Sequence, residues 1–390
     1  MRVLLSLCAA LVLLWSTVQC RPSHDHSHHG NDYSHHDNDH CRHGNNNNSV
    51  SASGSLKIYQ ENLDFAFCLY KHISAQPDSQ SKNVFSSLSV SMALAALSVG
   101  ARGKTHQQLF EGLGFNSTEI TTEEVNQAFQ HIHHNLNEKT DNTEEAKEQI
   151  NTYVHEKTKG KISDLVQDVD PLTVMYLINY IYFKGKWEIQ FNPKVTKDHD
   201  FHVDDKTTVS VSMMHKKDDF HVYHDEDIYT HVLQLHYNES VSMMLVLPEK
   251  GLQGLEKVVC KNHLQKWIRS VEMKTYSVYV PKLSLKTSYQ LKEILSEMGI
   301  TDIFGDTANL TGISEGGKLV VSKVMHKATL DVDKAGATAA AATGIEIGML
   351  GIPYPSLEPP VLKFDHPFMI FVLSRETRSI LFMGKIVNPA

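Results

Sequence analysis

Helical and strand-like patterns occupy different parts of this chain, and their order limits the folds that it can adopt. Leu88–Val99 is apolar nearly all round, which is typical of a buried helix, and Thr143–Thr158 is a polar helix with a Glu-rich first turn. Thr173–Phe183, Val241–Leu247 and Tyr276–Leu285 are rich in aromatic and branched residues and predict strands. Helices therefore come early and strands late, without regular β-α alternation. This order predicts an α+β body and excludes a Rossmann fold or an α/β barrel.

The first 55 residues differ in character from the rest of the chain. A secretory signal peptide is predicted over residues 1–20. The chain has a positively charged start at Met1–Arg2, a short apolar run over Val3–Trp15, and small residues for cleavage before Arg21. Residues 21–55 are rich in His, Asp, Ser, Gly and Asn, and we expect them to be disordered because they offer little apolar surface to bury. A single folded domain is predicted over residues 56–390. The apolar run is too short to span a bilayer, so we expect a secreted, extracellular protein.

Composition narrows the classes of function. A hydrophobic content of 41% supports a real core, and a net charge of -8 argues against a nucleic-acid partner.

Gly312–Gly316 matches the GxSxG pattern of hydrolases, which requires a buried strand before it and a helix after it. The polar stretch Asp306–Thr311 precedes it and a predicted strand, Lys318–Val321, follows. We therefore predict a Gly-rich turn and no catalytic residue. We also expect no cofactor and a monomeric protein.

Two compositional signals mark candidate modification or binding sites. Four Asn-x-Ser/Thr sequons predict glycosylation, with Asn116 and Asn238 the better candidates and Asn47 and Asn309 the others. The tail holds eight histidines that predict weak binding of Zn²⁺, Cu²⁺ or Ni²⁺ without a fixed spacing: His24, His26, His28, His29, His35, His36, His40 and His43.

An alanine-rich segment follows the alternating strand Val324–Val332. It reads Gly336, Ala337, Thr338, Ala339, Ala340, Ala341, Ala342, Thr343, and an extended, Pro-rich stretch over Gly351–Pro360 comes after it. Alanine favours helix, but a helix here would have no apolar face beyond methyl groups. A chain that slides into an existing sheet needs small side chains on its inward face, and Ala337, Ala339, Ala341 and Thr343 share one face of a strand. Gly336 supplies the conformational freedom of a hinge.

Four separated motifs, in order, resemble the serpin family. They are NVFSSLSVSMALAALSVGARGKT (Asn83–Thr105), NYIYFKGKWEIQF (Asn179–Phe191), the hinge Gly336–Thr343 and FDHPFMIFVLSRETRSILFMGKIVNP (Phe364–Pro389). Segments such as EGLGFNSTEI and DLVQDVDP are most similar to the alpha-1-antitrypsin-like members. The resemblance implies three β-sheets, about nine helices and an exposed reactive loop. It also places Ser86, Ser89, Asn179 and His326 in a structural region called the shutter, and Trp187 in one called the breach.

The resemblance further implies a mechanism and a partner. An extracellular serine protease would attack the loop and form a covalent acyl-enzyme, after which the cleaved loop would insert into the main sheet. Counting from Gly336 places the reactive bond at Leu350-Gly351, with Met349-Leu350 as the alternative. No Lys or Arg lies between Lys334 and Lys363, so the target is expected to be chymotrypsin-like or elastase-like.

One departure from the family pattern keeps a second hypothesis open. Only the short segment 137–142 precedes the helix that is predicted to begin at Thr143. At this place the family has a further strand, helix and strand. About forty residues are missing, the size of such a unit, and their loss would remove two strands from the main sheet. The alternative to an inhibitor is a non-inhibitory serpin-like carrier or a folding-defective isoform.

Overall fold

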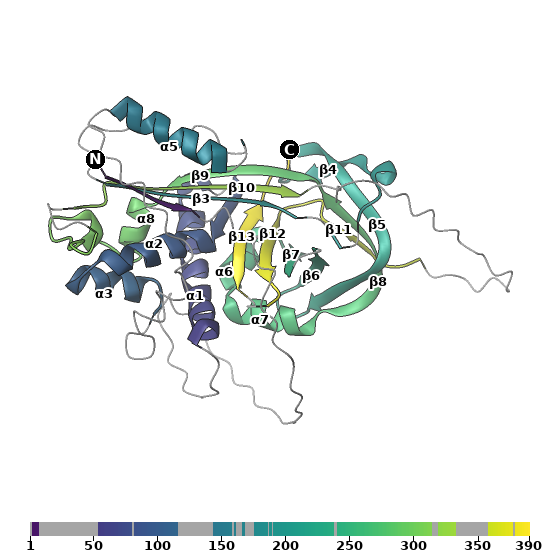
Figure 1. The fold of residues 1–390 in the computed structure, drawn as a ribbon. Helices are drawn as coiled ribbons and strands as arrows, with labels where there is room; N and C mark the ends of the chain where they lie inside the picture. The colour runs from purple at the N-terminus through teal and green to yellow at the C-terminus, as the bar shows by residue number, and fades with distance from the viewer. Residues whose placement is uncertain are drawn as a thin grey trace, which may run out of the picture.

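The chain forms an α+β body in which helices gather beside one sheet and a second, larger sheet lies next to it (Figure 1). A computed structural model describes residues 2–7, 54–79, 82–115, 143–157, 160, 166–167, 175–185, 187–188, 190–237, 240–313, 319–332, 358–376 and 379–390. The α-helices in these ranges are α1 (Gly54–Ala75), α2 (Leu88–Gly100), α3 (Gly103–Gly112), α5 (Thr143–Lys157), α6 (Leu252–Val258), α7 (Lys261–Ser270) and α8 (Lys292–Glu297). Within these ranges no helix combines the length and apolarity that a bilayer crossing requires.

The smaller sheet has four strands in the order β1-β3-β10-β9. They are β1 (Arg2–Leu7), β3 (Met175–Lys184), β10 (Lys323–Val332) and β9 (Leu283–Gln290). Strand β3 is parallel to both of its neighbours, whereas β9 is antiparallel to β10. Helix α5 lies on one side of this sheet, and α1 and α2 lie on the other (Figure 1). We refer to it below as the main sheet.

The larger sheet has nine strands, in the order β11-β8-β5-β6-β7-β12-β13-β2 with β4 paired to β5. Its strands are β2 (Val84–Ser87), β4 (Lys197–His202), β5 (Thr208–Asp225), β6 (Thr230–His236), β7 (Val241–Pro248), β8 (Glu272–Pro281), β11 (Val361–Lys363), β12 (Phe368–Ser374) and β13 (Ile380–Ile386). Two of the three expected sheets are joined here, because the 18-residue strand β5 pairs with β8 over most of its length and with β6 at its end.

Most of the predicted elements are present with small shifts of their ends. The buried helix predicted at Leu88–Val99 is α2, and the strand predicted at Thr173–Phe183 is β3. The single strand predicted at Tyr276–Leu285 is wrong, because the chain leaves β8 at Pro281 and starts β9 at Leu283 in the other sheet. Pro281 has no N–H for a sheet ladder, whereas the N–H of Lys282 still donates to the Ser212 carbonyl on β5. The change of sheet therefore comes after Lys282.

Two apolar clusters hold the body together. One lies between α1, α2, α3, α7 and α8 and the sheet faces that they cover, and it includes Leu94, Leu97 and Trp267. The other lies between the two sheets and includes Phe183, Trp187 and Phe368. The main sheet is therefore covered by helices at one end and packed against the larger sheet at the other.

Candidate functional site

The boundary between β3 and β10 is the part of the main sheet that a loop strand would have to open. These strands pair in parallel from Lys323↔Tyr176 to Asp331↔Lys184, with His326 opposite Asn179. Alternate residues of β10 are buried, including Val324, His326, Ala328, Leu330 and Val332, which gives the strand the period-2 pattern read from its sequence.

Three buried polar side chains meet at this boundary. The Ser89 hydroxyl, on α2, donates to Asn179 Oδ1 at 2.6 Å, and Asn179 Nδ2 donates to the Ser89 carbonyl at 2.8 Å. His326 Nδ1 donates to the same Asn179 Oδ1 at 2.7 Å. Each of the three residues is at most 1% exposed. Asn179 therefore ties helix α2 to β3 and ties β3 to β10.

Burial fixes the charge of His326. The absence of solvent lowers the pKa of this imidazole to about 4, an effect partly opposed by a backbone hydrogen bond at Asn179. The side chain is neutral at physiological pH and acts as a hydrogen-bond donor. The Tyr289 ring, on β9, lies nearly parallel to it with ring centroids 6.3 Å apart. Sequence reasoning did not single out Tyr289, although the register of β9 with β10 places the two residues opposite each other.

Trp187 lies just beyond the end of β3 and is 2% exposed. Its ring stacks on Tyr237 at 4.2 Å, and Phe191 meets it edge-on at 6.1 Å. Gly185 lets the backbone pass close to Tyr237, because a Cβ at that position would lie 2.3 Å from the Tyr237 ring. The contacts are those of a packed core position, where burial raises the pKa of the Tyr237 phenol.

The structure places the other predicted site residues as follows. The backbone of Ser86 pairs with Met383 in the β2–β13 ladder, and its side chain lies outside the described residues. Asn309 is exposed, and its Oδ1 accepts a hydrogen bond from the Thr311 hydroxyl at 2.8 Å. Asn47, Asn116, Asn238, the eight tail histidines, the hinge Gly336–Thr343 and the bonds at Met349–Gly351 lie outside the described residues.

The two ends of the predicted loop are described, and they lie in different sheets. The chain leaves the main sheet at Val332, the last residue of β10, and re-enters at Val361 on β11, an edge strand of the larger sheet. The carbonyl of Pro360 accepts a hydrogen bond from Ser277 N at 2.9 Å, which fixes the far end. Residues 333–360 therefore connect two sheets from a start directly beside β3.

Comparison with known proteins decides the family. The family model described as "Serpin (serine protease inhibitor)" matches residues 60–144 and 139–389. The chain belongs to the serpin family. Among curated serpins, Alpha-1-antiproteinase 2 of Equus caballus is 40% identical over 376 residues, covering 85% of this chain and 87% of the relative. Hibernation-specific plasma protein HP-55 of Tamias sibiricus is 39% identical over 368 residues, with 84% and 87% covered.

Solved serpin structures share the fold. Human thyroxine-binding globulin in complex with its hormone superposes with a TM-score of 0.77 at 32% identity, covering 87% of this chain and all of the other. Human glycosylated kallistatin gives a TM-score of 0.76 at 35% identity, with 87% and 99% covered. The family match is split in two, and the two parts meet at residues 139–144, the place where the sequence departs from the family pattern.

Proposed function

We propose that this serpin is a secreted inhibitor that traps chymotrypsin-like or elastase-like serine proteases as a suicide substrate. One observation carries the proposal: β10 runs beside β3 and leads directly into the small-residue segment Gly336–Thr343. The alpha-1-antiproteinase names of the relatives support inhibition, and the name of one relative, a plasma protein, supports secretion. In this role the chain supplies a substrate bond and no catalytic group.

The covalent step takes place at the predicted reactive bond. The serine oxygen of the protease attacks the carbonyl carbon of Leu350 and forms an ester, while the Leu350–Gly351 peptide bond breaks. The proton of the serine passes to the nitrogen of Gly351, which leaves as a new N-terminus. If Met349–Leu350 is the bond cut instead, the same atoms react one residue earlier.

Insertion then follows from strand geometry. A segment that turns back after Val332 runs antiparallel to β10. Because β3 is parallel to β10, a segment inserted between these two strands is antiparallel to both. One parallel ladder is replaced by two antiparallel ones, which are slightly more stable per residue. An inserted strand of about 18 residues, at about 3.3 Å per residue, would carry the attached protease about 60 Å. Distortion of the protease by this displacement stops water from releasing it.

The shutter contacts would control this insertion. The hydrogen bond from His326 to Asn179 crosses the boundary that has to open, and the Ser89 contacts hold Asn179 on the β3 side. Opening the sheet breaks the crossing bond in a site without solvent, where a lost hydrogen bond is costly. The contacts therefore help keep the sheet closed until cleavage frees the loop.

The loop composition sets the class of target. Leu or Met before the scissile bond fits an apolar pocket, whereas trypsin-like enzymes bind a cation against a buried Asp. Residues 335–362 contain no Lys or Arg, so that Asp would stay unpaired. The lost pairing reduces the rate with trypsin-like enzymes by roughly a thousandfold or more.

A carrier or folding-defective isoform is the second candidate, and two observations favour it. The family match breaks at residues 139–144, where about forty residues were expected to be missing. Thyroxine-binding globulin, whose structure was solved with its hormone, has a fold similar to that of this chain. A serpin lacking part of its main sheet could keep such a role without inserting a loop.

One gel experiment separates the two candidates. The mature chain is incubated with chymotrypsin, elastase or trypsin and analysed by SDS electrophoresis. Inhibition predicts an SDS-stable band of higher mass with chymotrypsin or elastase, and a released fragment that begins at Gly351, or second at Leu350. Cleavage without a stable band supports the carrier or isoform. Faster trapping of trypsin than of elastase contradicts the proposed specificity.

A further inference from the structure

Two histidines face each other at the end of the β5–β6 hairpin, far along the chain from the reactive loop. His224, near the end of β5, pairs directly with His231, near the start of β6. Their rings stack with centroids 4.4 Å apart and an interplanar angle of 20°. The turn between them includes Tyr229, which has a positive φ of 51°. Strand pairing therefore holds the two imidazoles side by side.

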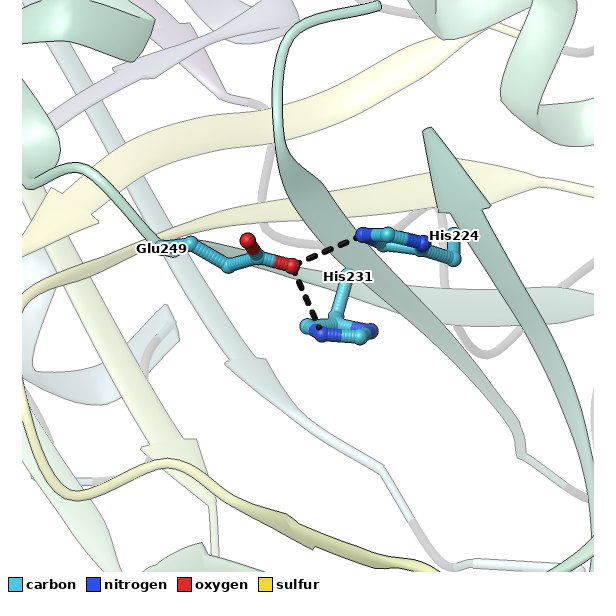
Figure 2. Close-up of side chains that lie close together, drawn as sticks. All are labelled: His224, His231 and Glu249. Atoms are coloured by element: carbon cyan, nitrogen blue, oxygen red, sulfur yellow. Dashed lines mark hydrogen bonds and ion pairs between the residues drawn. The ribbon is translucent and has the colours of Figure 1, made fainter. Parts of the chain in front are cut away.

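A carboxylate from the next strand completes the cluster. Glu249 follows Pro248, the last residue of β7, and its N–H donates to the Tyr229 carbonyl at 2.9 Å. Its Oε1 lies 2.7 Å from His224 Nε2 and 3.1 Å from His231 Nε2. Figure 2 shows both imidazoles turned toward this one oxygen. One ligand atom from each residue lies within 4.8 Å of the others.

This donor set is one that proteins use for zinc. Two imidazole nitrogens and one carboxylate oxygen leave the fourth tetrahedral position open for water, as in many zinc sites. Bonds of about 2.0–2.2 Å place neighbouring ligand atoms about 3.3 Å apart in a tetrahedral site. The observed 2.7 and 3.1 Å separations therefore need to widen by about 0.6 and 0.2 Å, respectively. The three side chains are 39%, 34% and 40% exposed, so they can adjust and an ion can reach them.

The electrostatic surroundings also suit a cation. Burial lowers the pKa of His231, and the neighbouring His224 lowers it further, against the opposing effect of Glu249. Neutral imidazole is the form that binds a metal. Two lysines on neighbouring segments have partners of their own: Lys266 pairs with Asp225 and Asp227, and Lys250 lies over the Tyr229 ring at 3.1 Å.

We propose that His224, His231 and Glu249 form a Zn²⁺-binding site that links strands β5, β6 and the end of β7. The ion takes the place of the hydrogen bonds that both imidazoles now make to Glu249. It cross-links three adjacent strands of the larger sheet and stabilises the folded chain. The site is independent of protease inhibition, and its presence or absence says nothing about the reactive loop.

Thermal unfolding with added Zn²⁺ tests the site without interference from the tail. An ion stabilises the fold only through sites that the unfolded chain lacks, and the tail histidines are predicted to be disordered in both states. We expect Zn²⁺ in large excess over its Kd to raise the Tm of the full mature chain by a few degrees. His231→Gln and Glu249→Gln should each weaken the apparent affinity at least about tenfold, since even indirect supports of a metal ligand have effects of that size.

The matched control is His221→Gln, three residues earlier on the same strand. His221 packs against His236 at 4.9 Å and is not part of the cluster, so this variant should keep the full zinc-dependent rise. The proposed site would be ruled out if zinc raised the Tm of the wild type and of the Glu249→Gln variant equally. It would also be ruled out if zinc did not raise the Tm of the wild type. Crystals of the full chain grown with zinc should give an anomalous-difference peak among the three side chains. Anomalous peaks that lie only at other places in the folded domain would contradict the proposal. Glu249 is a surface residue, so its variant remains informative if a histidine variant fails to fold.

Discussion

Asn179 uses one buried amide to join three elements, because it bonds Ser89 through both its oxygen and its nitrogen and accepts from His326. Asn179→Ala would leave the buried groups of Ser89 and His326 without these hydrogen-bond partners, at positions that water cannot reach. We expect the free energy of unfolding to fall by about 2–3 kcal/mol, measured by urea denaturation. Asn262→Ala, at an exposed position on α7, should change it by less than about 0.5 kcal/mol. A loss as small as that of the control would show that the buried contacts add little.

His326 should make stability depend on pH in a defined direction. In the unfolded chain its pKa is about 6.5, whereas burial lowers the native value to about 4. Between these values the unfolded state binds a proton that the native state does not, so stability is complete above about pH 6.5 and falls as the pH drops toward 4. The total loss from this group is about 3 kcal/mol.

Urea midpoints measured between pH 4.5 and 7.5 check this expectation. His326→Gln should flatten the slope in that window, because glutamine does not titrate. His202→Gln, which removes an exposed histidine, should keep the slope of the wild type. Parallel slopes for all three proteins would mean that His326 is not the group responsible.

At the scale of elements, the alternation of the hinge gives a test within a single segment. Ala337, Ala339 and Ala341 share the inward face of the inserted strand, and Ala340 lies on the opposite face. Ala337→Arg or Ala339→Asp would bury an unpaired charge, which costs several kcal/mol and slows insertion. Either variant should become a substrate that chymotrypsin or elastase cleaves without an SDS-stable complex.

Ala340→Asp is the matched control for the hinge. It adds the same charge one residue away on the outer face, where solvent can reach it, and inhibition should persist. Full inhibition by Ala339→Asp would rule out insertion as the mechanism for this chain. Loss of inhibition in both variants would show that charge anywhere in the segment is enough.

The elements differ in how well their sequences predicted them. Leu88–Val99 is a long, almost wholly apolar run and Val324–Val332 alternates with period 2, so α2 and β10 were predicted nearly to the residue. Tyr276–Leu285 looked continuous because both halves are strand-like, and the change of sheet at Lys282 depends on tertiary pairing. His224, His231 and Glu249 come together through the register of three strands. The facing histidines of the hairpin were the one local signal that could have revealed the cluster.

For the whole molecule, the tail should be dispensable. Residues 21–50 contribute no predicted core residue, so their removal should change the Tm by less than about one degree and leave any inhibition intact. Differential scanning calorimetry and the protease gel measure the two effects. A drop of several degrees would show that the tail packs against the folded domain.

The pairing of β1 with β3 has a consequence for the life of the protein. Arg2–Leu7 covers Met175–Tyr180 on the outer edge of the main sheet, yet these six residues lie within the predicted signal peptide. If they are removed on secretion, the edge of β3 loses its partner, and its free N–H and C=O groups can accept another extended chain. The full-length chain and the processed chain would then differ in self-association. The mature protein would stay monomeric when dilute, and at high concentration its molecules would associate into linear oligomers through that edge.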